Sequence, residues 1–479
     1  MSKILKNTTA SDIEISDTGI TVDASPGTYT IPATDYLLWA ASDNIITEMG
    51  TGDIVVNDGS FDLSISDGTD LIKGIFPTSI DVNTSQTNPL TVKPSNVDAF
   101  GRTRVSEVNT MFDYNFSKIV DLDLYWDVKL ESGATAVHIP EHAHYELNVT
   151  NTIGSKATLK SRRHMEYHTG KSHIAYFTGN PHSIQAGMRK RLGLFTGEDG
   201  YFFELNSTGG HVVVRNDSTD IVIDQVDFNG DKLDGTGASG ITVDSTKQQL
   251  FFIELQWLGS GFVRFGYILD GGQHVVLHTH YVGNVKEHPF TATAVLPFRI
   301  EVECVATALA ADKVEVTCFS YMYEGKVHSP VKVRDWDSGL TTITVNGTQQ
   351  AIFGIRVNPS YGESAIKMLE STINLVSGNS EVRWQLLHNV TFTGTPAWST
   401  ETNSIAQTLT SPGAVSYSGG YKTLSGFVNV GASTILNLSL SDVVLGHSID
   451  GDMDCFLLVV ETVSSNSKAV SDVHWEEFS

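Results

Sequence analysis

The chain has 479 residues, a formal net charge of −24 and only three cysteines. This length exceeds one ordinary hydrophobic core, so we expect several domains. The acidic balance argues against binding to a nucleic-acid backbone or insertion into an anionic membrane, because both need clustered cations. The odd, sparse cysteines argue against a secreted disulfide scaffold. No signal peptide and no apolar run of about 20 residues is recognisable, so we expect assembly in the cytoplasm.

Residues 1–78 predict a small acidic module built from short strands. Residues 1–94 carry 13 acidic and 4 basic side chains. A module of this size is only marginally stable alone, so we expect a partner surface to complete it and interpret it as an attachment module. The expected strands are 13–15, 27–31, 36–39, 45–48 and 54–56.

Residues 79–106 predict a linker. The stretch 77–105 contains three prolines and many Ser, Thr and Asn residues. Polar sequence interrupted by proline favours extended chain over a packed core.

Residues 107–332 predict a central β-sandwich. The strongest signal is 249–282, where apolar and polar residues alternate through three strands separated by Gly-rich turns at 259–261 and 270–272. A hairpin at 201–205 and 211–215 precedes it, and a strand pair at 296–305 and 313–324 follows. At least ten strands over this length fit a jelly-roll or concanavalin-like, lectin-like sandwich.

Residues 333–479 predict a second, C-terminal β-sandwich, which makes the fold class all-β. Short helices fit the sequence only at 36–41, 186–192 and 366–369. The expected strands are 341–345, 350–357, 371–376, 382–387, 421–428, 455–462 and 470–475.

No motif for catalysis is recognisable, so we expect no enzyme, no catalytic residues and no cofactor. The sequence lacks a Gly-x-Ser-x-Gly elbow, a phosphate-binding loop, His-Glu-x-x-His and the Glu-x-Asp-x-x-Glu string of one group of glycosidases. Glu301 and Glu303 share a strand face, but nothing in the sequence distinguishes an acid from a nucleophile.

Two patterns resemble metal sites and fail on inspection. The acidic run 227–234 has Lys232 where a calcium loop needs glycine, and Ala238 where it needs glutamate, so a polar loop is the better interpretation. The pairs His142/His144 and His278/His280 share strand faces but lack a recognisable third ligand. We expect solvent-facing histidines and no metal.

A basic patch is the main candidate for partner binding. In so acidic a chain it is a candidate surface for an acidic partner, although a solvated strand face is the favoured interpretation. Three aromatic residues, Trp126, Tyr167 and Tyr176, are candidates for stacking on a sugar but are more typical of a core. The residues assigned to the patch are Arg162, Arg163, Lys171, Arg189, Lys190 and Arg191.

The sequence DAFGRTRVS at residues 98–106 resembles a junction motif shared by structural proteins of tailed-bacteriophage virions. The strings RKRLGLF at 189–195 and DKLDGTGASG at 231–240 resemble the same group, as does VHWEE at 473–477. The opening MSKILKNTTASDIEI resembles N-terminal modules placed before several phage proteins. The linker motif residues are Asp98, Phe100, Gly101, Arg102 and Arg104, of which the two arginines are expected to brace the linker against the central domain.

The resemblance implies a virion component assembled in the host cytoplasm with other neck, tail or capsid proteins. A module, linker and two sandwiches imply a collar, neck or tail-fibre subunit, expected to be a homotrimer because symmetric assembly covers strand edges. A tail-tip protein binding a host surface glycan and a capsid decoration protein are the alternatives, with a depolymerase a more distant one.

Overall fold

A computed structural model shows an all-β protein whose contacts divide it into residues 1–94 and 95–479. The structure describes six strands of the first unit. Of the second unit it describes residues 107–122, 124–269, 272–325, 332–338, 342–378, 380–409, 416–429, 433–437, 444–464 and 466–478. The linker motif of residues 98–106 lies outside the described residues, as do the expected strands 36–39 and 45–48. No helix in the described part of the chain is long and apolar enough to cross a membrane.

The first unit contains a sheet of order β4-β1-β5-β6 and a separate β2-β3 hairpin. The expected strands at 13–15, 27–31 and 54–56 are therefore confirmed to within a residue. The strands are β1 (Lys3–Asn7), β2 (Ile13–Ile15), β3 (Ile20–Val22), β4 (Thr28–Ile31), β5 (Ile54–Asn57) and β6 (Asp62–Leu63).

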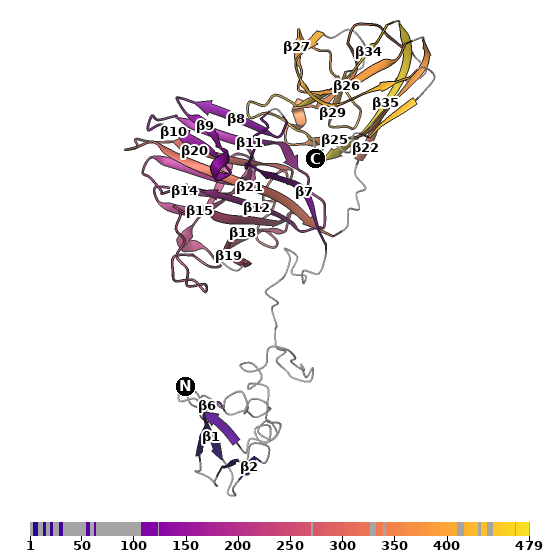
Figure 1. Ribbon diagram of the computed structural model, residues 1–479. Coiled ribbons are helices and arrows are strands. Elements are labelled where there is room, and N and C mark those ends of the chain that lie inside the picture. Colours follow the sequence, from indigo (N-terminus) through magenta and orange to yellow (C-terminus); the bar gives the residue numbers. More distant parts are fainter. Residues whose placement is uncertain are drawn as a thin grey trace. The chain divides into compact units, whose positions relative to one another are not determined.

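Two antiparallel sheets form the central sandwich (Figure 1). The first, called the β21 sheet, has the order β19-β18-β17-β12-β21-β10-β9, and β7 also pairs with the long strand β21. The three-strand meander predicted at 249–282 is confirmed as β17, β18 and β19. The bounds are β7 (Val108–Asn115), β9 (Thr135–Ile139), β10 (His144–Val149), β12 (His173–Asn180), β17 (Gln249–Gln256), β18 (Phe262–Leu269), β19 (Gln273–Tyr281) and β21 (Asp312–Glu324).

The second sheet of the central sandwich, called the β20 sheet, has the order β16-β15-β14-β13-β20-β11-β8. The prediction that a short helix fits at 186–192 is wrong, because most of this segment belongs to strand β13. Its bounds are β8 (Trp126–Glu131), β11 (Lys156–Met165), β13 (Met188–Phe195), β14 (Gly200–Asn206), β15 (Gly209–Asn216), β16 (Thr219–Asp224) and β20 (Leu296–Cys304), and the 3-10 turns of this domain are Pro140–His142 and Gln225–Asp227.

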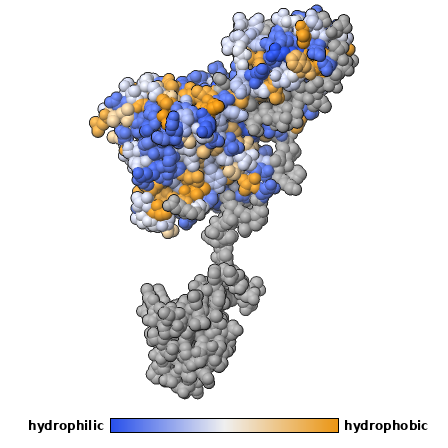
Figure 2. All heavy atoms as spheres, viewed as in Figure 1, coloured by the Kyte–Doolittle hydropathy of each residue, from blue (hydrophilic) through white to orange (hydrophobic). Residues whose placement is uncertain are grey.

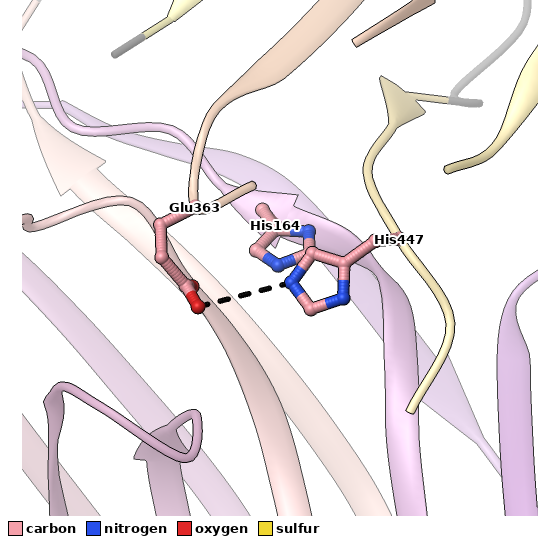
Figure 3. Close-up of side chains that lie close together, drawn as sticks. All are labelled: His164, Glu363 and His447. Carbon is pink, nitrogen blue, oxygen red and sulfur yellow. Dashed lines mark ion pairs between the residues drawn. The ribbon is translucent and has the colours of Figure 1, made fainter. Parts of the chain in front are cut away.

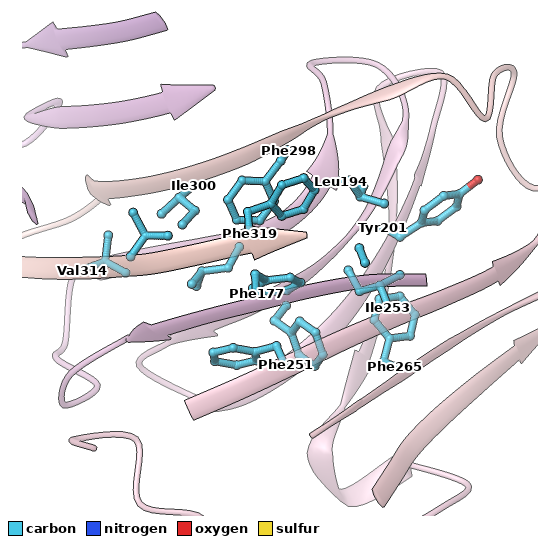
Figure 4. Close-up of a cluster of buried hydrophobic side chains, with 14 of the residues drawn as sticks. Phe177, Leu194, Tyr201, Phe251, Ile253, Phe265, Phe298, Ile300, Val314 and Phe319 are labelled. Atoms are coloured by element: carbon cyan, nitrogen blue, oxygen red, sulfur yellow. The ribbon is translucent and has the colours of Figure 1, made fainter. Parts of the chain in front are cut away.

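Aromatic residues from both sheets meet in the core of the central sandwich (Figure 4). Phe298 of β20 stacks on Phe319 of β21 with ring centroids 4.1 Å apart, and Phe177 stacks on Phe251 at 5.1 Å. Strand alternation places these rings inward, and burial of such large side chains is the main term that stabilises the sandwich. On the face shown in Figure 2, hydrophilic and apolar side chains are interspersed.

The C-terminal sandwich also has two sheets, of order β22-β35-β25-β32 and β28-β29-β24-β34-β26-β31. The helix considered at 366–369 is wrong, since these residues lie in β25. Strands β23 and β33 pair with β35 and β25, β27 pairs with β30, and a 3-10 turn covers Pro359–Tyr361. The bounds are β22 (Lys332–Asp337), β23 (Ile343–Val345), β24 (Gln350–Val357), β25 (Ala365–Gly378), β26 (Val382–His388), β27 (Thr391–Thr393), β28 (Ser399–Thr400), β29 (Ala406–Leu409), β30 (Ser416–Ser418), β31 (Tyr421–Val428), β32 (Ser433–Asn437), β33 (Val444–Leu445), β34 (Cys455–Thr462) and β35 (Ser467–Phe478).

Among the described strands, no sheet combines strands of 108–324 with strands of 332–478. The two sandwiches therefore have separate sheets, and any coupling between them comes from side chains and loops.

Candidate functional site

The two sandwiches are joined through residues 446–454, here called the junction loop, which lies between β33 and β34. Gly446 bonds Asp454 through its carbonyl oxygen, and a short bridge pairs His447 with Met453. These contacts close the loop into a narrow hairpin. The loop then contacts β8 and β11 of the central sandwich through both backbone and side chains.

Charged side chains of the central sandwich hold the junction loop. Arg162 donates to Asp454 at 3.1 Å, and the Asp454 side chain is only 1% exposed. Lys129 pairs with Asp450 at 2.6 Å. The Asp127 carboxylate accepts a hydrogen bond from the Ile449 amide at 2.7 Å. An ion pair as buried as Arg162–Asp454 stabilises the contact only while both partners are present, because an unpaired buried charge costs about 3–5 kcal/mol.

Lys160 is the most deeply buried cation of the junction. Its ammonium group donates to the backbone carbonyl oxygens of His447 and Ser448. Burial lowers the pKa of Lys160 to about 8, although Asp454 and Glu363 act in the opposite direction. The ammonium group thus replaces its water shell with carbonyl oxygens of the other domain.

Apolar residues supplement these polar contacts. Leu124 of the central domain belongs to the core cluster of the C-terminal sandwich, and Tyr125 packs against it. A second cluster joins Val295 with Val444 and Phe478, and Tyr167 packs against it. The junction therefore combines buried apolar area with buried ion pairs, as a stable interface between domains does.

A cavity of about 260 Å³ opens beside the junction loop. Lys129, Lys156, Lys160 and Arg299 contribute positive charge to its wall, and Glu131 and Glu363 contribute negative charge. Such a polar cavity suits water or a small ion better than an apolar ligand.

The outer face of the β20 sheet carries a network of paired charges. Arg191 donates to Glu204 at 2.7 Å and to Glu301 at 3.1 Å. Burial by itself raises the pKa of Glu301, but the charges of Arg299, Lys156 and Arg191 outweigh that effect and hold the pKa at about 2. The positive and negative side chains of this face are therefore paired with one another and hold neighbouring strands together.

The six residues of the predicted basic patch do not form one free surface. Arg189 bonds Glu303 at 2.7 Å, Arg163 bonds Glu166 at 2.9 Å, and Lys171 lies over the Tyr323 ring. Lys190 points to the opposite face from its neighbours and pairs with Asp312 at 2.8 Å, with both side chains almost fully buried. Together with Arg162 and Arg191, described above, they hold elements of this chain in place.

Several sequence-based expectations about other polar and aromatic residues need correction. Trp126 is fully buried in the core, so it has no face for a sugar. The expectation of solvent-facing histidines is wrong for His144, His278 and His280, which are all at most 9% exposed. His144 lies near Glu315, at 3.8 Å, because the register of β10 and β21 places both on one face.

A second cavity, of about 290 Å³, lies at one end of the central sandwich and is here called the end cavity. Its lining includes Phe203, Tyr267 and Leu277, with His211 and Asp234 among the polar residues. Residues 225–248, which connect β16 to β17, supply much of the wall.

Asp231 organises this connecting segment. Its carboxylate accepts hydrogen bonds from the amides of Leu233 and Ser239, and its own amide bonds the Val276 carbonyl. Two backbone amides thus use both carboxylate oxygens of Asp231, which agrees with a structured polar loop rather than a calcium loop.

Comparisons with known proteins identify no relative by sequence. No protein-family model matches the chain, and no curated protein matches it. A glycosyl hydrolase family protein from Mycobacterium fortuitum is 14% identical with a TM-score of 0.31, covering 44% of this chain and 99% of that one.

Two further solved structures show a likeness of the same degree. The CBM2 module of the evolved Dit of Lactobacillus casei BL23 phage J-1 is 9% identical with a TM-score of 0.29, covering 47% of this chain and 99% of that one. Peanut lectin is 8% identical with a TM-score of 0.29, covering 47% and 100%. Likenesses this weak carry no argument about what the chain binds or does.

Proposed function

We propose that this chain is a non-enzymatic structural subunit of a tailed-phage virion, in the collar, neck or a tail fibre. Residues 1–94 dock it to another virion protein, and the two sandwiches project as one stiff body. The motif of residues 98–106 suggests the virion, and the junction is the single structural observation that supports the mechanical role.

The junction suits a mechanical part because it limits movement between the sandwiches. A flexible tether would leave the charges of Lys160 and Asp454 in water, whereas here both are almost fully buried against the other domain. Opening the junction exposes apolar area and separates ion pairs, so the sandwiches are expected to move together.

Three buried glutamates of the central sandwich are paired with arginines. Glu301 bonds Arg191 and Arg299, Glu254 bonds Arg264, and Glu166 bonds Arg163. A general acid requires a raised pKa, whereas the pKa of Glu301 is held low. Glu301 is therefore unsuited to act as a general acid, and the paired charges support a structural role for this face.

The subunit is proposed to form a homotrimer, because open sandwiches leave strand edges that symmetric assembly covers. Light scattering coupled to size exclusion on the full chain tests this directly. A trimer supports a projecting appendage, and a monomer contradicts it.

Quantitative mass spectrometry of purified virions tests the virion role. The chain should be present at roughly tens of copies, as expected of a symmetric appendage. Labelling with an antibody against the C-terminal sandwich should mark the neck or tail. Absence from purified particles contradicts the proposal, and hundreds of copies spread over the capsid indicate a decoration protein instead.

Binding of a host surface glycan is a second candidate function, favoured by the end cavity. Polar residues of its lining, such as Lys232 and Asp234, match the hydroxyl groups of a sugar, whereas Phe203, Tyr267 and Leu277 are at most 7% exposed and belong to the core. A screen of the full chain against host polysaccharides tests it, with Asp234→Ala as the variant. Binding that the variant does not change excludes the end cavity.

A further inference from the structure

Three potential metal ligands meet at the junction from three separate segments of the chain. His164 lies on β11, Glu363 follows the 3-10 turn Pro359–Tyr361, and His447 belongs to the junction loop. One ligand atom from each lies within 4.8 Å of the other two (Figure 3). The His164 and His447 rings are 4.8 Å apart between centroids.

His164 is buried without satisfying its polar atoms. The side chain has no exposed surface, and neither ring nitrogen makes a hydrogen bond of ordinary geometry, although the Arg162 backbone lies close to the ring. Buried polar groups are nearly always bonded, because leaving one unpaired costs free energy. A β-bulge between Lys160 and His164 in the pairing of β11 with β20 sets the direction of this ring, and bulges commonly redirect side chains at functional sites.

The hydrogen bonds of His447 leave one ring nitrogen available for a ligand. Its Nδ1 lies 2.7 Å from the Ser448 carbonyl oxygen, which favours Nδ1–H as a donor, and 3.2 Å from the Lys160 ammonium group, which favours Nδ1 as an acceptor. Its Nε2 has no hydrogen-bond partner and lies 3.9 Å from Glu363 Oε1, so in the Nδ1–H tautomer a lone pair faces Glu363. A ring that donates one N–H to a carbonyl while its other nitrogen faces a metal is the usual arrangement of a ligating histidine.

Glu363 supplies the charge that such a site needs. Its Oε2 atom is buried without a hydrogen-bond partner, although the side chain as a whole is 24% exposed. Unpaired polar atoms of Glu363, His164 and His447 therefore belong to one cluster of potential ligands.

We propose that His164, His447 and Glu363 bind a divalent transition-metal ion of the zinc type. Two imidazoles and one carboxylate form a donor set that such ions prefer. Bonds of about 2.0–2.1 Å in a tetrahedral site place donor atoms roughly 3.3 Å apart, so the 3.9 Å separation of His447 and Glu363 closes with shifts of a few tenths of an ångström.

This ion links the two sandwiches, because His164 comes from the central domain and the other two ligands from the C-terminal one. Glu363 and His447 also line the 260 Å³ cavity, so a water molecule can take the fourth position. The carboxylate offsets one charge of the ion. The nearby ammonium of Lys160 is held by two carbonyl oxygens, with Asp454 and Asp127 acting on it as well.

A second cluster shows why the first is the better site. His144, Glu146 and Glu315 also converge, but the Lys313 ammonium lies 2.5 Å from Glu146 and 2.9 Å from Glu315. A lysine cation already neutralises those carboxylates, whereas the lysine beside the first cluster, Lys160, contacts His447 and acts on Glu363 and His164 through its charge alone.

The test uses the full chain, purified without a polyhistidine tag, stripped with a chelator and titrated with zinc or cobalt. Wild type should bind one ion per chain, and Co²⁺ should give the visible bands of a four-coordinate site. His447→Gln and Glu363→Gln should each weaken binding at least tenfold. His474→Gln, an exposed histidine elsewhere in the same domain, is the control and should bind as wild type does.

Hydrogen exchange provides a readout that depends on the junction rather than on zinc content. Zinc should slow exchange of the Gly446 and Ile449 amides in wild type and in His474→Gln, but not in His447→Gln. Absence of stoichiometric binding at micromolar zinc overturns the proposal. Binding that both ligand variants retain in full also overturns it.

Discussion

Replacing Gly446 with alanine is expected to disrupt the junction while leaving each sandwich folded. A Cβ atom at this position would lie 2.2 Å from His164 Nδ1 and 2.8 Å from the Arg162 carbonyl oxygen. Ordinary contact begins at 3.4 Å, so the loop and β11 must separate by about 1.2 Å (3.4 − 2.2). His164 is fully buried and the Arg162 oxygen belongs to the backbone, so neither moves easily.

The expected cost follows from the two ways of relieving this clash. Overpacking that keeps the loop in place costs about 1–3 kcal/mol. Lifting the loop instead breaks the Arg162–Asp454 pair and leaves buried charge, which costs about 3–5 kcal/mol. We expect the free energy of unfolding to fall by about 2–4 kcal/mol, with denaturant curves separating into two transitions as the sandwiches uncouple.

The matched control is Gly362→Ala in the same domain. Its Cβ would meet only the Pro359 carbonyl oxygen, at 3.9 Å, and its φ of −51° suits alanine. Denaturant unfolding followed by circular dichroism and hydrogen exchange measures both variants. If Gly446→Ala unfolds in one transition at the denaturant concentration of wild type, the reasoning about a tight junction is refuted.

Three further predictions concern the central sandwich. Lys190→Met should lower the free energy of unfolding by about 3–5 kcal/mol, because it leaves the Asp312 carboxylate buried without its cation. Adding Asp312→Leu should recover much of this loss. Equal denaturant stability of the single and the double variant would contradict the prediction. The pKa of Glu301 in the folded protein, about 2, lies below its ordinary value of 4.5. The ionised Glu301 therefore contributes on the order of 3 kcal/mol to the free energy of unfolding. This contribution is present above about pH 4.5 and is lost as the pH falls toward 2. Thermal unfolding from pH 7 to pH 3 should therefore show a steeper loss in wild type than in Glu301→Gln. Asp231→Ala should speed exchange of the Ser239 amide at a stability cost of about 1–2 kcal/mol, and unchanged exchange would argue against its role in ordering residues 225–248.

Strands could be predicted from the sequence where apolar and polar residues alternate and Gly-rich turns bound the alternating segment. The meander of β17, β18 and β19 has both signals, and its predicted position is confirmed. Residues 186–192 carry helix-forming side chains, and the local sequence does not reveal that Arg189 and Arg191 face Glu303 and Glu301 across two strands. Tertiary pairing overrides local propensity there.

The junction cluster could not be found from sequence spacing. His164, Glu363 and His447 lie far apart in the chain, and no two of them belong to one short motif. Histidines two residues apart, such as His142 and His144, can be paired from sequence because near neighbours on a strand share a predictable face. Contacts between domains depend on how separate sheets dock, which alternation does not encode.

The distribution of charge bears on the choice of partner. Residues 1–94 have a net charge of −9 (4 − 13), and residues 95–479 therefore have −15 (−24 + 9). The cations that the sequence offered as a docking patch are engaged within the chain, as the Arg191–Glu301 and Lys190–Asp312 pairs show. A neighbouring copy thus presents no free basic patch at these residues for the acidic first unit. Electrostatic complementarity instead favours a basic surface on a different protein, with an association that weakens as salt increases.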